Sequence, residues 1–299
     1  MHYSKIFIRV VFIFVVFFYF LFLVEISLRT LGHFYSRKTV LDEISNSQTF
    51  NILCLGDSFT YGWGVETAYS YPKQLEGMLN NGNLIRRFNV INLAVPGSNS
   101  SQHLKYLEDI LSKYRKLSLI IILTGVNDGW NLADSNIYKF INKKQDKLNL
   151  INIKLRIFLS NFRTYKMLKA ILLNLKGKAP ESEISPFKQL PGYENIDKGI
   201  LKQLLEYNLT QLVDLAKFNN LKIILLNYPR GDLYGDNITK RVALHFKVPF
   251  VDNYSAFNKK LKGADFGDLF IYDNSHPNAV GYKIMAEGIY KAIVEEMLK

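Results

Sequence analysis

The chain opens with a long hydrophobic stretch. Residues Val10–Val24 are all apolar or aromatic, and Ile6–Phe7 extend the stretch past Arg9 to roughly the 20 residues that cross a bilayer as a helix. A cleaved signal peptide would need a pair of small residues at its cleavage site. The following segment, Val24–Arg29, offers no such pair. The pattern therefore predicts an uncleaved, single-pass membrane anchor over residues 1–30.

The residues that follow the anchor are polar and lack clear periodicity. Residues 31–50 are interpreted as a juxtamembrane linker to a soluble domain that occupies residues 51–299. Lysine and arginine flank the anchor on both sides, so the positive-inside rule gives no orientation from charge alone.

Beyond residue 50, short apolar runs alternate with longer amphipathic ones. Short apolar runs of this kind are typical of strands buried on both faces of a parallel sheet. Apolar residues at three- and four-residue spacing predict helices over Leu104–Tyr114 and from Val280 onward. This alternation predicts an α/β sandwich with helices on both faces of the sheet. The five predicted strands are Asn51–Leu55, Val90–Leu93, Leu119–Leu123, Leu221–Leu226 and Pro249–Val251.

Residues 131–200 interrupt the alternation of strands and helices. They lack a strand signal and contain helical patches such as Met167–Leu175. A helical insertion is predicted here, and two interpretations of it stay open. It either forms a lid over the site or is plain helical packing.

Net charge and cysteine content give limited information on the partners of the protein and on the role of its cysteine. The formal net charge is +12, but the basic residues are dispersed and form no compact block with interleaved aromatics, so no nucleic-acid partner is expected. A basic surface facing anionic lipid or an acidic polymer is one interpretation, and compositional bias of the source genome is the other. The single cysteine, Cys54, lies in an apolar run and is predicted to be a buried core residue.

Four loops carry the candidate chemistry. In parallel sheets, loops at the carboxyl ends of the strands gather at one edge, where sites form. The first predicted strand leads into Gly56-Asp57-Ser58, the second into Pro96-Gly97-Ser98 and the third into Gly125-Val126-Asn127-Asp128. The last helix is preceded by Asp273-Asn274-Ser275-His276-Pro277.

These loops contain the groups that an acyl transfer requires. A serine hydroxyl needs a base to take its proton, and His276 is the candidate base for Ser58. Asp273, three residues earlier, is placed to orient the imidazole. Donors fixed before the reaction would stabilise charge on the substrate oxygen, each contributing about 3 kcal/mol. The candidate donors are the backbone amides of Ser58 and Gly97 and the side-chain amide of Asn127.

Together the four blocks resemble the ordered motifs of the SGNH, or GDSL-like, hydrolase family, and they span residues 51–299. Phe59 follows the Gly-Asp-Ser triplet where the family has leucine. The resemblance implies a three-layer α/β/α sandwich around a parallel sheet of about five strands, and hydrolysis of carboxylic esters, including acyl groups on lipids and polysaccharides. It implies a catalytic triad of Ser58, Asp273 and His276, and oxyanion donors from Ser58, Gly97 and Asn127.

The resemblance also implies a setting. Membrane-tethered bacterial members carry the domain outside the cytoplasmic membrane and act on cell-surface glycans, so an acylated polysaccharide or lipid and the membrane are the expected partners. No cofactor or metal is expected, since His33, His103 and His245 lack carboxylate or cysteine neighbours at ligand spacing and are interpreted as surface or capping histidines. Two alternatives stay open: a polysaccharide O-acyltransferase using the same triad, and an inactive, membrane-tethered binding module.

Other polar and aromatic residues in these loops are interpreted more modestly. Asp57 and Asp128 are expected to hold neighbouring loops by hydrogen bonds. Tyr61, Trp63 and Trp130 either line a pocket for acyl groups or sugars or simply pack the loops.

Overall fold

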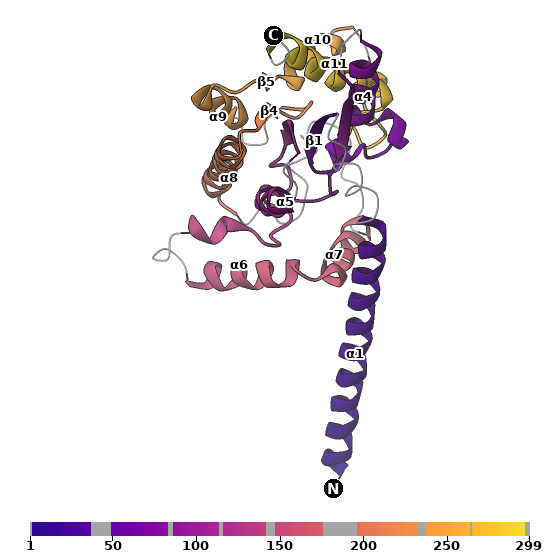
Figure 1. Cartoon of the computed structure of the whole chain (residues 1–299). Coiled ribbons are helices and arrows are strands. Elements are labelled where there is room, and N and C mark those ends of the chain that lie inside the picture. The colour runs from indigo at the N-terminus through magenta and orange to yellow at the C-terminus, as the bar shows by residue number, and fades with distance from the viewer. Residues whose placement is uncertain are drawn as a thin grey trace.

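Five apolar segments of the chain form one parallel sheet in the computed structural model, which describes residues 2–36, 49–82, 86–113, 116–141, 147–175, 196–231, 237–263 and 265–296. The strand order is β2-β1-β3-β4-β5, and β1, β4 and β5 are labelled in Figure 1. All five predicted strands are confirmed. They are β1 Phe50–Gly56, β2 Phe88–Asn92, β3 Leu119–Leu123, β4 Lys222–Leu226 and β5 Phe250–Val251.

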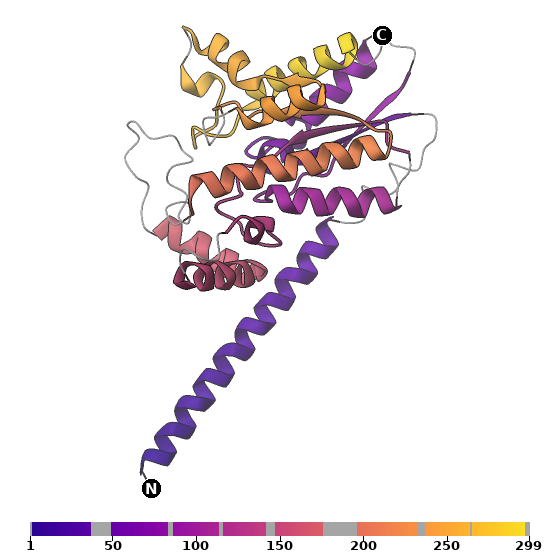
Figure 2. The same ribbon diagram turned by 90° about the vertical axis from the view of Figure 1, so that its left-hand side faces the viewer.

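Helices cover both faces of the sheet, as the alternation of apolar runs predicted (Figure 2). One face is covered by α4 Tyr71–Asn81, α10 Asn253–Leu261 and α11 Ala279–Glu296. The other is covered by α5 Ser100–Lys113, α8 Lys198–Phe218 and α9 Ile238–Phe246. Successive strand side chains point to opposite faces, so Cys54 joins the first core and Leu53 and Leu55 join the second. The three-layer α/β/α sandwich is confirmed.

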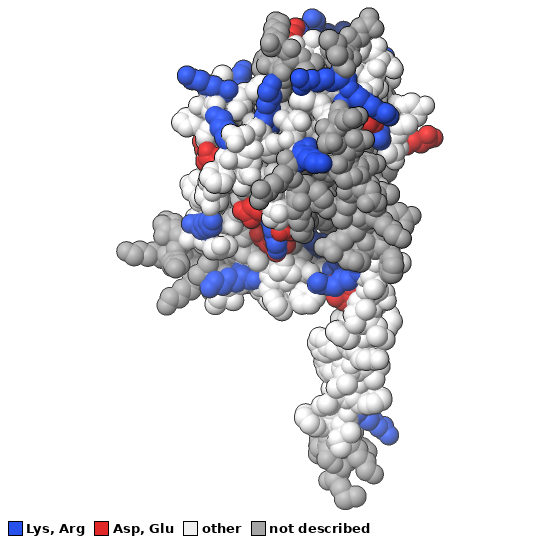
Figure 3. Space-filling model, viewed as in Figure 1, with Lys and Arg blue, Asp and Glu red and all other residues white. Residues whose placement is uncertain are grey.

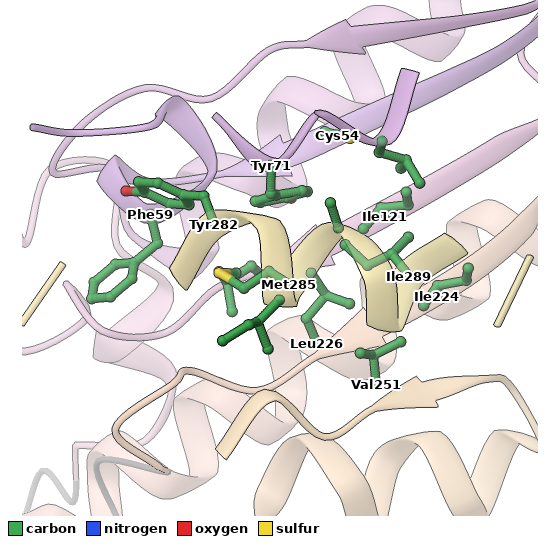
Figure 4. Close-up of a cluster of buried hydrophobic side chains, with 14 of the residues drawn as sticks. Cys54, Phe59, Tyr71, Ile121, Ile224, Leu226, Val251, Tyr282, Met285 and Ile289 are labelled. Atoms are coloured by element: carbon green, nitrogen blue, oxygen red, sulfur yellow. The ribbon is translucent and has the colours of Figure 1, made fainter. Parts of the chain in front are cut away.

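The first core lies between the sheet and α11. Tyr282, Met285 and Ile289 of α11 are fully buried against strand residues such as Ile121 and Ile224 (Figure 4). Cys54 is also fully buried there, and burial raises the pKa of its thiol, so the prediction of an unreactive core cysteine is confirmed.

The parallel register sets up the site. Gly56 at the end of β1 pairs with Leu123 at the end of β3, and Cys54 pairs with Asn92 at the end of β2. The carboxyl ends of the three central strands therefore lie at one edge. In this strand order, the chain leaves β1 toward β2 on one side and leaves β3 toward β4 on the other, so the direction of the connections reverses between β1 and β3. In open α/β sheets, ligands bind beside such a reversal.

The amino-terminal helix projects away from the sandwich. Helix α1 His2–Ser36 contains a segment, Ile6–Leu31, that is long and apolar enough to cross a membrane (Figure 1). It continues past the predicted end of the anchor at residue 30, and most of the predicted linker lies outside the described residues. Within the predicted insertion lie the 3₁₀ turn η2 Asn136–Lys139, α6 Lys147–Ser160 and α7 Arg163–Leu175. The boundaries of anchor, linker and insertion stay predictions.

Candidate active site

Ser58 lies at a tight junction between strand and helix. It is the first residue of the short helix α3 Ser58–Tyr61, and the Asp57 side chain caps this helix by accepting a hydrogen bond from the amide of Phe59 at 3.0 Å. Glycine is required at position 56, because a Cβ atom there would lie 2.8 Å from the carbonyl oxygen of Leu123. The serine is thus held at the carboxyl end of β1, only partly buried.

A continuous line of hydrogen bonds joins the three predicted triad residues. Ser58 Oγ lies 2.8 Å from His276 Nε2, and His276 Nδ1 lies 2.6 Å from Asp273 Oδ2. These separations are those of a nucleophile, its base and the group that orients the base. The structure therefore brings together residues 218 positions apart in the sequence.

The loop that carries Asp273 and His276 is fixed by its own backbone. Asp273 Oδ1 accepts hydrogen bonds from the amides of Ser275 and His276, both at 2.9 Å, while the amide of Ile271 donates to the carbonyl of His276 at 2.9 Å. Burial alone would raise the pKa of Asp273, but the hydrogen bonds from the His276 ring and from these amides hold it below its ordinary value. Asp273 is therefore ionised at neutral pH and fixes the ring through Nδ1.

Gly97 lies in a turn that faces this edge. Ser98 N donates to Val95 O at 3.0 Å, Pro96 is the second residue of the turn and Gly97 the third, with φ +75°. Proline followed by a glycine of positive φ is the pattern of a type II turn. The turn is attached to β1, since Val95 N donates to the carbonyl of Gly56 at 3.0 Å.

Asn127 is linked to the same turn. Its side-chain amide donates to the carbonyl of Ser98 at 3.1 Å, which leaves the second N–H of that amide for another acceptor. Within the described part of the chain, no hydrogen-bond acceptor is found for the backbone amides of Ser58 and Gly97. The three predicted oxyanion donors thus lie on linked loops at the carboxyl ends of β1, β2 and β3.

Comparison with known proteins gives the family. The GDSL-like lipase/acylhydrolase family matches residues 54–284, which include every predicted site residue. The chain belongs to this family. An uncharacterized protein of Mycoplasma pneumoniae is 27% identical over 165 residues, which are 51% of this chain and only 19% of that relative.

Solved structures show the same fold. A catalytic mutant of an acetylxylan esterase from Geobacillus stearothermophilus is 18% identical, with a TM-score of 0.51 over 84% of this chain and 97% of that one. An alpha/beta hydrolase enzyme from the metagenome of Lake Arreo, Spain, is also 18% identical, with a TM-score of 0.50 over 83% of this chain and 96% of that one. At these identities the likeness concerns the fold alone.

Beneath the GDSL-like motif, Asp57 is fully buried and holds two loops together, as its interpretation from the sequence predicted. Tyr228 donates from its hydroxyl to Asp57 Oδ2 at 2.6 Å and accepts from the amide of Val126 at 3.2 Å. Burial raises the pKa of Asp57 to about 6, although the hydrogen bonds from Tyr228 and Phe59 act in the opposite direction. Sequence reasoning missed Tyr228. The available signal was its place two residues after the end of β4, at the same edge of the sheet.

Removing the Tyr228 hydroxyl is expected to destabilise the fold. Tyr228→Phe takes one donor from the buried Asp57 carboxyl and one acceptor from Val126, and the free energy of unfolding is expected to fall by about 1–3 kcal/mol. Denaturant unfolding of the two proteins in the same detergent measures the difference. Tyr254→Phe, at a partly exposed tyrosine on α10, is the matched control. Equal losses in both variants would contradict a role for the Asp57 contact.

Asp128 forms a second buried junction. Ser100 donates to it from its backbone amide and its hydroxyl, each at 2.7 Å, and Asn208 of α8 donates to Ser100 Oγ at 2.7 Å. Burial raises the pKa of Asp128 to about 7 against these hydrogen bonds, and the negative charge of Asp57 raises it further. The expected loop-holding role of Asp128 agrees with these contacts, which tie the β3 loop to α5 and α8.

The raised pKa of Asp128 predicts a pH-dependent stability. The unfolded chain loses this proton near the ordinary value of 3.8 whereas the folded protein holds it to about 7, so the wild type loses stability as pH rises between these values. Asparagine does not titrate, so the stability deficit of Asp128→Asn is expected to shrink over this window. Unfolding at about pH 4 and about pH 8 measures the change. The exposed Asp214→Asn is the control, and a deficit that grows with pH would contradict the prediction.

His103 differs from its interpretation as a surface or capping histidine. It is fully buried, with Nε2 2.5 Å from Ser98 Oγ and Nδ1 2.6 Å from Thr124 Oγ1. Burial lowers its pKa to about 3, so the ring is neutral and bridges the loops after β2 and β3. The interpretation was wrong because helix α5 turns this position toward the sheet. His245 is exposed, as expected, and the side chain of His33 lies outside the described residues.

Aromatic side chains surround the triad unequally. The Trp63 ring lies 6.4 Å from the His276 ring between centroids, and both Trp63 and Tyr61 are about half exposed. Trp130 instead packs inward. A Cβ atom on Gly97 would lie 3.3 Å from its ring, and Lys169 of α7 donates to its carbonyl at 2.8 Å. Among the described residues, no group of three or more His, Cys, Asp or Glu side chains is placed to hold a metal ion.

Proposed function

We propose that this protein is a serine ester hydrolase in which Ser58 is the nucleophile, His276 the general base and acid, and Asp273 the residue that orients the base. The observation that carries the proposal is the unbroken hydrogen-bonded line from Ser58 Oγ through His276 to Asp273, with separations of 2.8 and 2.6 Å. Membership of a family of lipases and acylhydrolases supports the same chemistry.

The first half of the reaction forms an acyl-enzyme. Ser58 Oγ attacks the carbonyl carbon of the ester while His276 Nε2 takes the hydroxyl proton, and the ionised Asp273 stabilises the imidazolium that results. The negative charge on the carbonyl oxygen is stabilised by the amides of Ser58 and Gly97 and by the side chain of Asn127. When the tetrahedral intermediate collapses, the alcohol leaves with the proton from His276, and the acyl group stays on Ser58.

The second half uses water. His276 Nε2 takes a proton from a water molecule, whose oxygen attacks the acyl carbon, and the proton then returns to Ser58 Oγ as the carboxylic acid leaves. The imidazole must start neutral with its proton on Nδ1. The hydrogen bond from Nδ1 to Asp273 favours that tautomer.

For the substrate, we propose acyl esters on glycans of the cell envelope, with the domain outside the cytoplasmic membrane and tethered by α1. The partly exposed Trp63 beside His276 and the neighbouring Tyr61 support a sugar-binding rim, since aromatic faces pack against sugar rings as well as acyl chains. The apolar helix Ile6–Leu31 supports the tether.

The test uses the full chain in detergent micelles. Release of p-nitrophenol from acetyl, butyryl and octanoyl esters is measured beside release of acetate from an acetylated oligosaccharide, and a fluorophosphonate probe reports on the serine. Labelling that is lost in His276→Ala, with acetate released fastest, supports a glycan O-deacetylase. Fastest release of octanoate contradicts the glycan substrate and favours a lipid. Absence of both labelling and hydrolysis contradicts the enzymatic proposal.

A further inference from the structure

Helix α6 has an exposed stripe of apolar side chains along one side. Ile151, Leu155 and Phe158 are 61%, 51% and 59% exposed, and their spacing of four and three residues places them on one side of the helix. On the opposite side, Ile153 is buried in the second core of the domain, and Ser160 is also buried. Helix α6 therefore has one side that the fold buries and an opposite, apolar side that the fold leaves exposed.

The stripe continues into α7. Phe158 of α6 packs edge to face on Phe162 with ring centroids 5.2 Å apart, and Leu168 and Ile171 of α7 are 44% and 46% exposed. Contiguous exposed apolar patches mark sites of interaction with proteins or membranes, whereas apolar side chains scattered singly over a surface do not. We call residues 147–175 the α6–α7 segment.

The α6–α7 segment is bonded to α1 where the apolar run of α1 ends. Thr164 donates to Glu25 Oε2 from both its amide and its hydroxyl, each at 2.9 Å. Arg163 donates to the carbonyl of Leu28 at 2.5 Å. Glu25 is the first charged residue after Val10–Val24. These contacts fix the height of the segment along α1.

That height matches a membrane surface. Residues 6–24 of α1 are about 28 Å long at about 1.5 Å per residue, close to the roughly 30 Å of the hydrocarbon core. If α1 spans the bilayer, Glu25 and the start of α7 lie at the interface. In both views, α6 and α7 lie at the margin of the domain from which α1 departs, and α6 crosses the direction of α1 (Figures 1 and 2).

The charge of the segment suits anionic lipid. Helices α6 and α7 contain no Asp or Glu, while Lys154, Arg156, Arg163 and Lys166 lie within them. Lys169 also lies in α7, but it donates to the carbonyl of Trp130 and so is directed to the domain. Basic side chains are visible along this lower margin of the domain (Figure 3). Apolar side chains flanked by Lys and Arg are the composition of helices that lie in the membrane interface.

We propose that the α6–α7 segment is a second membrane contact, lying on an anionic lipid surface with Ile151, Leu155 and Phe158 inserted among the headgroups. This inference rests on the proposed role of α1 as a membrane span. It has a consequence for the site, since Lys169 of α7 donates to the carbonyl of Trp130, whose ring packs over Gly97. The two contacts together set the height and tilt of the active site above the membrane.

The test exploits the single buried cysteine, because Cys54 is inaccessible and an introduced cysteine is labelled selectively. Leu155→Cys in the full chain carries an environment-sensitive fluorophore, and the protein is reconstituted in phosphatidylcholine–phosphatidylglycerol vesicles. Phe218→Cys at the end of α8, where the native side chain is 86% exposed, is the matched control. Phe17→Cys reports on α1 itself.

For a segment inserted about 5–10 Å into the interface, emission from position 155 shifts to the blue and a headgroup-region nitroxide lipid quenches it, whereas position 218 shows neither effect. Position 155 quenched by aqueous iodide as readily as position 218 overturns the proposal. Protection from both quenchers also overturns it and indicates a second copy of the chain on the stripe. Position 17 out of reach of lipid quenchers overturns the anchor as well, while hydrolysis of soluble esters, measured in parallel, reports on the catalytic proposal separately.

Discussion

Replacing Ser58 with alanine is expected to lower kcat for ester hydrolysis by about 10⁴- to 10⁶-fold, since the loss of the nucleophile removes the acyl-enzyme route and leaves only binding and oxyanion stabilisation. The geometry gives the reason. In the proposed mechanism Ser58 Oγ attacks the reacting carbonyl, and His276 Nε2, 2.8 Å away, takes its proton. The measurement is steady-state release of p-nitrophenol by the two purified full-length proteins.

A matched control separates chemistry from folding. Ser112→Ala, at the exposed end of α5, removes the same hydroxyl far from the triad along the chain and is expected to leave kcat unchanged. The fluorophosphonate probe should label wild type and Ser112→Ala but not Ser58→Ala. A Ser58→Ala protein that keeps a tenth or more of wild-type activity would refute the assignment of the nucleophile.

Asp273→Asn is expected to lower kcat by about 10⁴-fold while leaving the fold intact, as the same replacement does in a Ser-His-Asp protease. The amide oxygen of asparagine can still accept from the amides of Ser275 and His276, so the turn survives. Its NH₂ group, however, would face His276 Nδ1, 2.6 Å from Oδ2 in the wild type. The ring would then carry its proton on Nε2 and could not accept the proton of Ser58.

Asp57→Asn is the informative comparison, because Asp57 is the other carboxyl group beside Ser58. Asparagine also caps helices well, and Asp57 contacts Tyr228 and Phe59 rather than the His276 ring nitrogens. Its replacement should affect unfolding more than kcat. If Asp57→Asn and Asp273→Asn lower kcat equally in folded protein, Asp273 is not the orienting acid. The pH dependence of kcat, measured for the wild type and both variants, then shows which replacement alters the pH–rate profile.

The strands and the loops that form the site could be predicted from the sequence, because they depend on the order of apolar and polar residues along the chain. Each of the five apolar runs forms a strand, and parallel strands necessarily bring their carboxyl ends to one edge, so the loops containing Ser58, Gly97 and Asn127 could be assigned to a single site from the hydrophobic pattern alone. The pair Asp273 and His276 was equally readable, since residues three apart in one turn lie within reach of each other.

Partners that lie far apart in the chain were decided only by the tertiary structure. Three contacts could not be predicted from the spacing of residues along the chain. They are the burial of His103 between two loops, the hydrogen bond from the Tyr228 hydroxyl to Asp57, and the hydrogen bonds from Thr164 to Glu25. The physical reason is that a hydrophobic pattern reports which face of an element is buried, because burial of apolar area is additive and local. The position of a polar side chain in the sequence pattern does not show whether it is hydrated or hydrogen-bonded to another residue. Which of the two occurs depends on whether the packing of the helices and strands places a hydrogen-bond partner within reach.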